Sequence, residues 1–182
     1  MTFSKKMNRR SFLYCGSSLL ASLALFGPSR TLALSSQTHP LSFYHTHTGE
    51  CLNIEFCPAQ PDKDTLEQVN HFLRDFRSGE VHPIDTELLA TLCLIQNAGS
   101  NSGTFEIISG YRSPHTNARL RKASSGVARR SLHMSGKAVD VRLRSMKTTR
   151  LRDLAHSLKR GGVGYYAKSD FVHIDTGRVR NW

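Results

Sequence analysis

The chain has 182 residues, a length that suits one medium-sized domain and leaves little room for a second. Hydrophobic residues make up 38% and charged residues 21%, which excludes a disordered protein, and four cysteines are too few for a disulfide-stabilised scaffold. The formal net charge is +11, but residues 1–33 contain five basic residues and no acidic one, so the charge of 34–182 is a moderate +6. No apolar run reaches the roughly 20 residues of a membrane span.

Residues 1–33 have the composition of an export signal. A basic start precedes a mildly apolar stretch of 15 residues at 12–26, and the small-x-small sequence at 31–33 suits cleavage. Residues 8–13 read Asn-Arg-Arg-Ser-Phe-Leu and resemble a twin-arginine signal, although an ordinary secretory signal or an uncleaved anchor would share the general pattern. We therefore expect export by the twin-arginine machinery to the periplasm, no stable membrane anchor, and a mature domain at 34–182.

Hydrophobic periodicity predicts a hairpin and two helices in the first half of this domain. Strand-like runs at 41–47 and 51–56 are joined by a Thr-Gly-Glu turn. An apolar stripe predicts a helix that begins at Asp64 and ends at the Ser-Gly pair 78–79. Asp85 is placed to cap a second helix.

The second half of the domain combines strands, one helix and a long basic segment. The basic segment, 111–137, has no clean period beyond a short helix at 117–123, and irregular segments of this length are usually functional. A further helix is predicted from Thr148, and strands are predicted at 105–109, 138–143, 163–166 and 171–175. The predicted class is α+β, with a small antiparallel sheet and helices packed on one side.

Three residues with metal-binding side chains lie in apolar predicted strands or directly before one. Asp140 lies in the run Ala-Val-Asp-Val, His173 lies in Phe-Val-His-Ile-Asp, and His133 lies in a loop that leads into the first of these strands. A buried carboxylate without a partner is costly, so Asp140 requires a cation or strong hydrogen-bond donors. Two imidazoles and one carboxylate form a common ligand set for catalytic zinc, and a buried His–Asp hydrogen-bond network is the alternative interpretation.

Other candidates carry weaker signals. His45 and His47 share one face of the first predicted strand, where we expect solvent exposure because no third ligand converges there. Arg112 follows the strand at 105–109 after a glycine, and its rigid guanidinium suits a carboxylate or a developing oxyanion. The alternative for Arg112 is an ion pair with a structural acid.

The order of these motifs resembles a known family. Ser-Gly-Tyr-Arg-Ser at 109–113, followed by His133, Asp140 and His173, resembles the zinc peptidases of the D-Ala-D-Ala carboxypeptidase and dipeptidase group, which share their fold with the hedgehog signalling domain. The closer match is to the murein endopeptidase K family. Blocks shared with that family span the whole chain and include the sequences at 47–50, 70–75, 126–128, 161–166 and 171–177, and Trp182.

This resemblance implies a role for several residues. It implies that zinc is held by the two histidines and the aspartate, and that Arg112 stabilises the oxyanion. It places the general base at Asp170, three residues before His173, and leaves Asp175 as the rival, which could instead orient an imidazole. Substrate contacts are expected along the basic segment, for which a solvated charged surface is the alternative; they are assigned to Tyr111, Arg112, Ser113, Arg129 and Arg130.

The implied function is that of a cell-wall zinc metallopeptidase. Zinc-activated water would hydrolyse peptidoglycan cross-links, with 3-3 diaminopimelate–diaminopimelate links favoured over 4-3 links, during murein growth and remodelling. The alternatives are a D,D- or L,D-carboxypeptidase acting on muropeptides and a non-catalytic zinc-containing module that binds the wall. Nucleic-acid binding is disfavoured, because part of the charge belongs to the export signal and aromatic residues do not interleave with the basic run.

Overall fold

The computed structural model describes residues 37–99, 103–124, 126–144 and 146–182, so the predicted export signal at 1–33 lies outside the described residues. The described residues belong to a unit that extends from Leu34 to Trp182. None of the helices in these ranges combines the length and the apolar composition needed to cross a bilayer.

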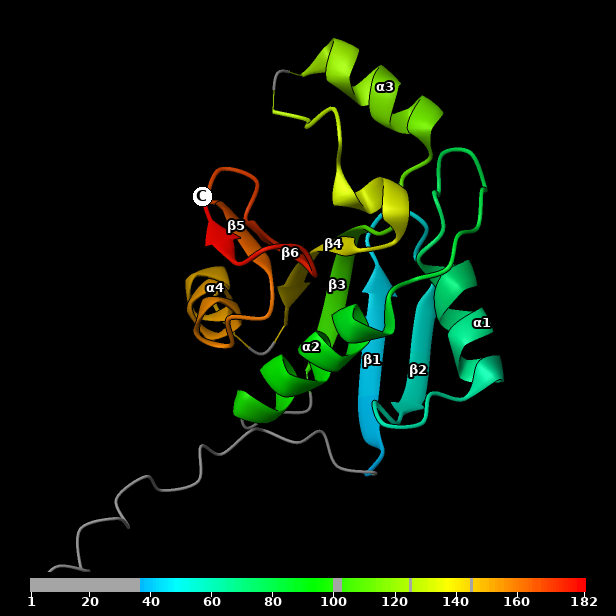
Figure 1. Ribbon diagram of the computed structural model, residues 1–182, viewed down its shortest axis with the longest axis vertical. Helices are drawn as coiled ribbons and strands as arrows, with labels where there is room; N and C mark the ends of the chain where they lie inside the picture. Colours follow the sequence, from blue (N-terminus) through cyan, green and yellow to red (C-terminus); the bar gives the residue numbers. More distant parts are fainter. Residues whose placement is uncertain (1–36, 100–102, 125, 145) are drawn as a thin grey trace, which may run out of the picture. The chain divides into compact units, whose positions relative to one another are not determined.

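Seven strands of the described residues form one mixed sheet (Figure 1). Their order across the sheet is β2-β1-β3-β4-β6-β5-β7. Neighbouring strands pair antiparallel except for β1 with β3 and β5 with β7, which are parallel. The strands are β1 His39–His45, β2 Cys51–Phe56, β3 Thr104–Ser109, β4 Ala138–Leu143, β5 Gly162–Tyr166, β6 Phe171–Asp175 and β7 Arg180–Asn181.

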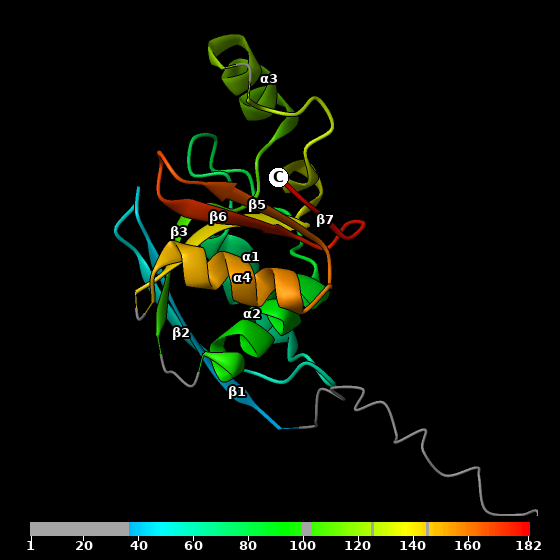
Figure 2. The same ribbon diagram turned by 90° about the vertical axis from the view of Figure 1, so that its left-hand side faces the viewer.

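Three helices pack on one face of this sheet (Figure 2). Helix α1 (Lys63–Phe72) contacts β2, α2 (Thr86–Ala98) contacts β1, and α4 (Thr148–Ser157) contacts β4, β5 and β6. Their apolar side chains and the inward side of the strands bury one continuous core, and burial of this apolar surface is the main stabilising term. The α+β class and the one-sided helix layer are therefore confirmed, whereas the sheet is mixed rather than purely antiparallel.

The two faces of β4 and β6 carry different chemistry because side chains alternate along a strand. Val139 and Val141 belong to the core that the helices cover. Asp140 lies between them and points to the opposite face. The antiparallel register pairs Asp140 with His173 and Val139 with Ile174, so both polar side chains lie side by side on the face away from the core.

The first predicted helix has different ends in the structure. Asp62, rather than Asp64, is the cap, because its carboxylate accepts a hydrogen bond from the Thr65 N–H. The helix ends at Phe72, so the predicted end at 78–79 is wrong. Residues 75–79 form a turn beyond the helix, in which the carbonyl of Asp75 accepts hydrogen bonds from the N–H groups of the Ser-Gly pair.

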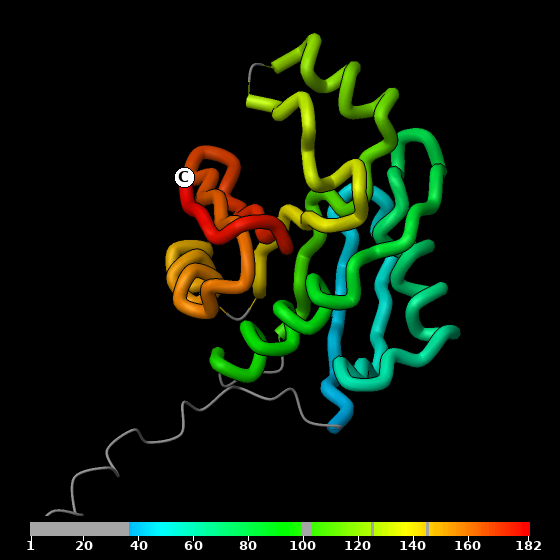
Figure 3. Tube along the Cα trace, viewed as in Figure 1, coloured from blue at the N-terminus to red at the C-terminus, as the bar shows by residue number. Residues whose placement is uncertain are grey.

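The basic segment 111–137 is more ordered than its sequence indicates. It contains the ten-residue helix α3 (Pro114–Ala123), capped by the Ser113 hydroxyl, and the short 3-10 helix η1 (Leu132–Ser135). Figure 3 follows this segment from the end of β3 out through α3 and back to η1. The parallel β1/β3 pair arises because the chain crosses over through α1 and α2 before it re-enters the sheet.

His45 is buried, so the expectation of an exposed strand face is wrong for this residue. The rings of Phe72 and Phe76 pack against its imidazole at centroid distances of 6.0 and 5.3 Å. Its Nδ1 accepts hydrogen bonds from the N–H groups of His47 and Thr48. Burial lowers the pKa of His45 to about 4, so the residue is a neutral acceptor that orders the β1–β2 turn.

Candidate metal centre

The three predicted ligands come together from three elements. His133 lies on η1, Asp140 on β4 and His173 on β6. Nε2 of His133 is 3.2 Å from both Nδ1 of His173 and Oδ1 of Asp140, and the last two atoms are 2.9 Å apart. All three residues are buried, and they form a group of side chains close enough to hold one metal ion.

The outer nitrogen of each imidazole has a hydrogen-bond acceptor. Nδ1 of His133 lies 2.7 Å from the Gly110 carbonyl, and Nε2 of His173 lies 3.1 Å from Oδ2 of Asp175. Because a carbonyl or a carboxylate only accepts, each outer nitrogen can carry a proton, which leaves the inner nitrogen of each ring to bind a metal ion.

A cation fits the donor set that results. Two imidazole lone pairs and one carboxylate oxygen meet within 3.2 Å, where they repel one another unless positive charge lies among them. Tetrahedral zinc with ligand distances of about 2.0–2.1 Å places its ligand atoms roughly 3.3 Å apart, close to the separations in this site. The residues present therefore fit a zinc-type ion.

The surroundings shift the pKa of each of the three side chains. Burial opposes ionisation of Asp140, but His133 and His173 outweigh it and hold the pKa of this carboxyl far below its usual range. Burial also acts against protonation of His173, yet its contacts with Asp140 and Asp175 raise its pKa. For His133, burial dominates and lowers the pKa.

Arg112 lies beside the cluster and is bonded to it. One terminal nitrogen, Nη2, donates to Oδ2 of Asp140 at 2.8 Å, and Nε donates to the Ser109 hydroxyl at 3.0 Å. Ser109 pairs with Asp140 across the β3–β4 register, so the two acceptors lie side by side. The two hydrogen bonds together fix the orientation of the guanidinium plane. Nη1 has no hydrogen bond to the described residues. The ion pair that the sequence offered as an alternative is present, and its acid is a predicted metal ligand.

Asp175 is held by more donors than any other acid of the site. Its oxygens accept hydrogen bonds from the N–H groups of Gly162 and Gly177 and from the Arg180 guanidinium, besides the contact with His173. Burial raises its pKa, but these donors outweigh burial and hold the pKa well below the usual range. The carboxylate is fixed as a permanent acceptor for His173.

Asp170 lies apart from the cluster, at the turn between β5 and β6. Its side chain is 65% exposed. One oxygen accepts a hydrogen bond from the Thr148 hydroxyl, and the other lies 3.6 Å from Nε of Arg142. It has no hydrogen bond to the three predicted ligands.

The remaining predicted site residues lie in two different environments. Tyr111 is buried, and its hydroxyl donates to Glu80 at 2.7 Å. Ser113 is also buried and caps α3. Arg129 and Arg130 are exposed on the segment between α3 and η1, and neither forms an ion pair within the described residues.

Two contacts of the centre were not assigned from the sequence. Arg180 and Trp182, on and after β7, reach the site face: Arg180 bonds to Asp175, and the Trp182 ring lies 5.3 Å from that of His173. A two-residue strand has no periodicity to reveal it, and the only signal was the position of Trp182 within the family resemblance.

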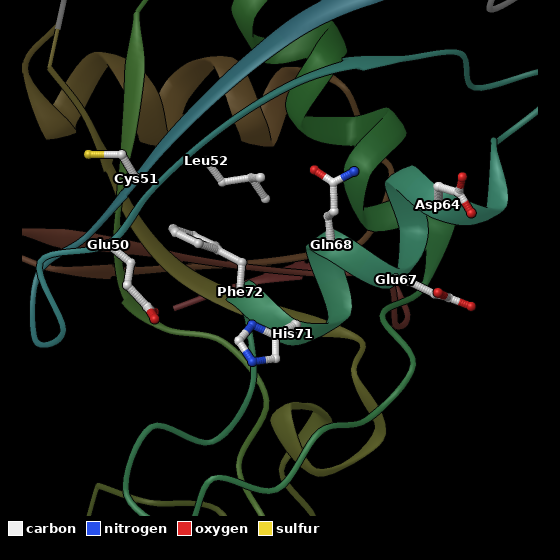
Figure 4. A pocket seen from close by; sticks show the side chains of 8 residues that line it. All are labelled: Glu50, Cys51, Leu52, Asp64, Glu67, Gln68, His71 and Phe72. Carbon is white, nitrogen blue, oxygen red and sulfur yellow. The ribbon is translucent and has the colours of Figure 1, made fainter.

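A cavity lies outside the centre. It has a volume of about 530 Å³ and opens between β2 and α1 (Figure 4). Residues such as Glu50, Glu67 and His71 line it, and none of the lining residues belongs to the metal cluster.

The described residues bring together a His–Asp–His group that could hold one metal ion, as a metal-dependent hydrolase requires. The chain belongs to the family described as peptidoglycan L,D-endopeptidase MepK, a peptidase family of the M15 type, whose model matches residues 33–182. The recognition made from the motifs is thereby confirmed, and so is the assignment of the chain as a peptidase.

Curated relatives agree with this family. A Haemophilus influenzae protein named "Probable peptidoglycan L,D-endopeptidase MepK" is 40% identical over 179 residues, which cover 96% of this chain and 95% of the relative. Proteins of Escherichia coli K12 and Shigella flexneri named "Peptidoglycan L,D-endopeptidase MepK" are each 37% identical over 176 residues, covering 96% of this chain and 97% of the relative. No solved structure shows a significant match to the chain.

Proposed function

We propose that this chain is a zinc-dependent endopeptidase that hydrolyses peptidoglycan cross-links, with 3-3 diaminopimelate–diaminopimelate links cut in preference to 4-3 links. The observation that carries the proposal is the convergence of His133, Asp140 and His173 on one point, with each outer imidazole nitrogen already bonded. Such a set holds a cation without rearrangement. The relatives named as peptidoglycan L,D-endopeptidases support the substrate class.

The residues of the centre divide the chemistry among them. A zinc ion bound here would supply Lewis acidity toward water and toward the amide carbonyl. Arg112 holds Asp140 through Nη2 and offers Nη1 to the oxyanion that develops on the carbonyl. Asp175 holds the ring of His173 and keeps its proton on Nε2.

We assign the general base to Asp170 and the orienting role to Asp175. The oxygens of Asp175 accept four donors besides His173 and have no capacity left for a proton in transit. Asp170 is the acid on the same hairpin with an exposed carboxylate, and catalytic hydrogen bonds often form only when substrate is bound. It accepts the proton of the attacking water and returns it to the leaving amine.

The proposal extends to export and to substrate approach. Residues 1–33 act as a twin-arginine signal that delivers the chain to the periplasm, where its substrate lies. Arg129 and Arg130 are exposed on the segment that leads to η1, and their charge suits the carboxylates of the murein peptides.

Digestion of purified sacculi tests the function. The zinc-loaded chain is incubated with sacculi beside His133→Ala, which removes a ligand, and His156→Ala, which removes an exposed histidine of α4. We expect cross-linked dimers to disappear with the wild type and His156→Ala and to persist with His133→Ala, as measured by mass spectrometry of the released muropeptides.

The identity of the products decides between the alternatives. Loss of 3-3 dimers before 4-3 dimers supports the proposed preference. Trimming of terminal residues with dimers intact would instead show a carboxypeptidase. Binding of the chain to sacculi without any cleavage would show a wall-binding module and would refute the catalytic assignment.

A further inference from the structure

Trp182 is a half-exposed aromatic side chain next to the metal centre. Its ring centroid lies 5.3 Å from that of His173, and 50% of the residue is exposed. Among the large hydrophobic residues of the described ranges, only Val81 and Val179 are exposed to a similar degree. An exposed apolar ring beside a reacting centre is a surface that a substrate can cover.

The ring is held in place rather than free to move. The backbone of Trp182 donates to the Val163 carbonyl and accepts from the Tyr165 N–H, which extends the sheet by one residue. The indole Nε1 donates to the Tyr166 hydroxyl at 3.1 Å, and the Arg180 guanidinium lies 4.9 Å from the ring centroid. The exposure is therefore a property of a fixed side chain.

Gly164 makes room for the indole on the site face. It pairs with His173 across β5 and β6, so a side chain at this position would point toward the same face as the ligand. A Cβ placed on Gly164 would lie 2.6–2.8 Å from three atoms of the Trp182 ring, closer than real contacts allow. The indole ring of Trp182 therefore occupies the space that a side chain at position 164 would fill.

We propose that Trp182 is a specificity-determining residue that packs against the aliphatic stem of the diamino acid flanking the scissile bond. This inference rests on the proposed endopeptidase function and names how its substrate is held. The ring adjoins the ligand His173, so the group that covers it is a neighbour of the reacting amide rather than the distant sugar. Arg112 lies at the charged part of the site, and Trp182 supplies the apolar part.

Fluorescence tests this contact directly, because Trp182 is the single tryptophan of the chain. The zinc-loaded chain is titrated with the sugar-free murein tetrapeptide, which contains diaminopimelate and has no cross-link to cut. We expect a saturable change in tryptophan emission. No saturable change at millimolar peptide, or a change only with the disaccharide lacking peptide, would overturn the proposal.

Kinetics with a soluble 3-3 cross-linked peptide dimer provide the second test. Covering an indole face with methylenes corresponds to about tenfold in binding, so Trp182→Ala should raise KM about tenfold and leave kcat and zinc content within threefold. Trp182→Phe should retain most of the affinity. Gly164→Ala keeps the tryptophan but displaces it, so it should resemble Trp182→Ala, whereas Val81→Ala alters an exposed apolar residue elsewhere and should match the wild type.

The outcomes separate this inference from the proposed function. A fall in kcat or zinc content at constant KM would show that Trp182 only supports His173, and would refute the inference. If the wild type fails to cut the dimer while the tetrapeptide still changes the emission, the proposed function fails and the substrate contact stands. Normal cleavage by all the variants would refute the contact alone.

Discussion

Asp140 is the residue through which the parts of the centre are connected. Its Oδ1 faces both imidazoles, and its Oδ2 accepts from Arg112. Because the carboxylate is buried, an unpaired charge here would be strongly destabilising, and the Arg112 guanidinium compensates it. The same geometry aims one oxygen at the metal position and orients the guanidinium beside it.

The substitution Arg112→Lys should show whether activity needs only a positive charge beside Asp140 or also the planar guanidinium. Lysine keeps a cation near Asp140 but lacks the planar fork that bonds Ser109 and Asp140 together. We expect zinc content to be retained and kcat to fall by about 10²–10³, the usual loss for one oxyanion donor. Turnover of the sacculus substrate per bound zinc measures the effect.

The matched control for this substitution is Arg144→Lys. Arg144 pairs with Glu106 on the same sheet and is largely exposed, so its replacement should leave turnover unchanged. Loss of zinc with unchanged turnover per metal in Arg112→Lys would mean that Arg112 serves only to hold Asp140.

Replacement of each candidate acid by asparagine should affect zinc affinity in one case and kcat in the other. Asp175→Asn weakens the acceptor of the His173 N–H, so we expect zinc affinity to fall by about 10–100-fold. Asp170→Asn removes a proton acceptor that does not touch the ligands, so we expect intact zinc binding and a kcat lower by about 10²–10⁴. Competition with a chelator and turnover at saturating zinc measure the two quantities. The reverse pattern would exchange the two roles.

At the scale of elements, β4, β6 and β7 build the site through their register. Asp140 and His173 lie opposite each other because β4 and β6 are antiparallel, and β7 then brings Arg180 and Trp182 to the same face. Strands β4 and β6 also contribute apolar residues to the opposite face, where the helices cover them. Asp140 and His173 therefore lie on strands whose other face is anchored in the core, which suits a centre that must keep its geometry.

The turn after β1 should make folding stability depend on pH. Buried His45 has a pKa of about 4 in the folded state against 6.5 in the unfolded state, because burial and the neighbouring charges of His47, Arg74 and Arg77 outweigh Glu50. Between these values the unfolded state binds the proton, so stability rises with pH. The contribution, up to about 3 kcal/mol, is present above pH 6.5 and is lost as pH falls toward 4.

His45→Asn provides the measurement for this turn. Asparagine keeps an acceptor near the position of Nδ1 for the N–H groups of His47 and Thr48 but does not titrate. Urea unfolding from pH 4 to pH 7 should show a shallower pH dependence in the variant than in the wild type. Parallel profiles would contradict the assignment, and exposed His156→Asn serves as the control.

For the whole molecule, metal binding should be coupled to thermal stability. The ligands come from η1, β4 and β6, so an ion that bridges them is bound by the folded state and not by the unfolded chain. Free zinc at 100 times its Kd would stabilise the fold by about 2.7 kcal/mol, or roughly 5–10 °C in Tm for a domain of this size.

A thermal melt with chelator and with zinc restored tests this coupling. We expect a lower Tm in chelator, recovery with zinc, and no response in His133→Ala. A response of equal size in that variant would show that zinc acts elsewhere on the chain. His156→Ala should behave as the wild type, because its side chain is exposed on α4.

Two of the predicted ligands, Asp140 and His173, could be singled out from the sequence because each stood in conflict with its surroundings. A carboxylate and an imidazole inside apolar strands carry a desolvation cost that only partners can offset. The strands themselves, the second helix and the final hairpin were predictable for a similar reason, since their periodicity is local. His45 was mispredicted because its cover, Phe72 and Phe76, comes from a distant part of the chain.

By itself, the sequence determined the three candidate ligands, the strands that carry two of them, the α+β class and the family, because these depend on residue identity and local pattern. The tertiary structure alone decided that the Gly110 carbonyl faces the outer nitrogen of His133 and that Trp182 rests on Gly164 beside His173. These contacts join residues far apart in the chain across the register of a folded sheet, and no local pattern records which atoms will meet there.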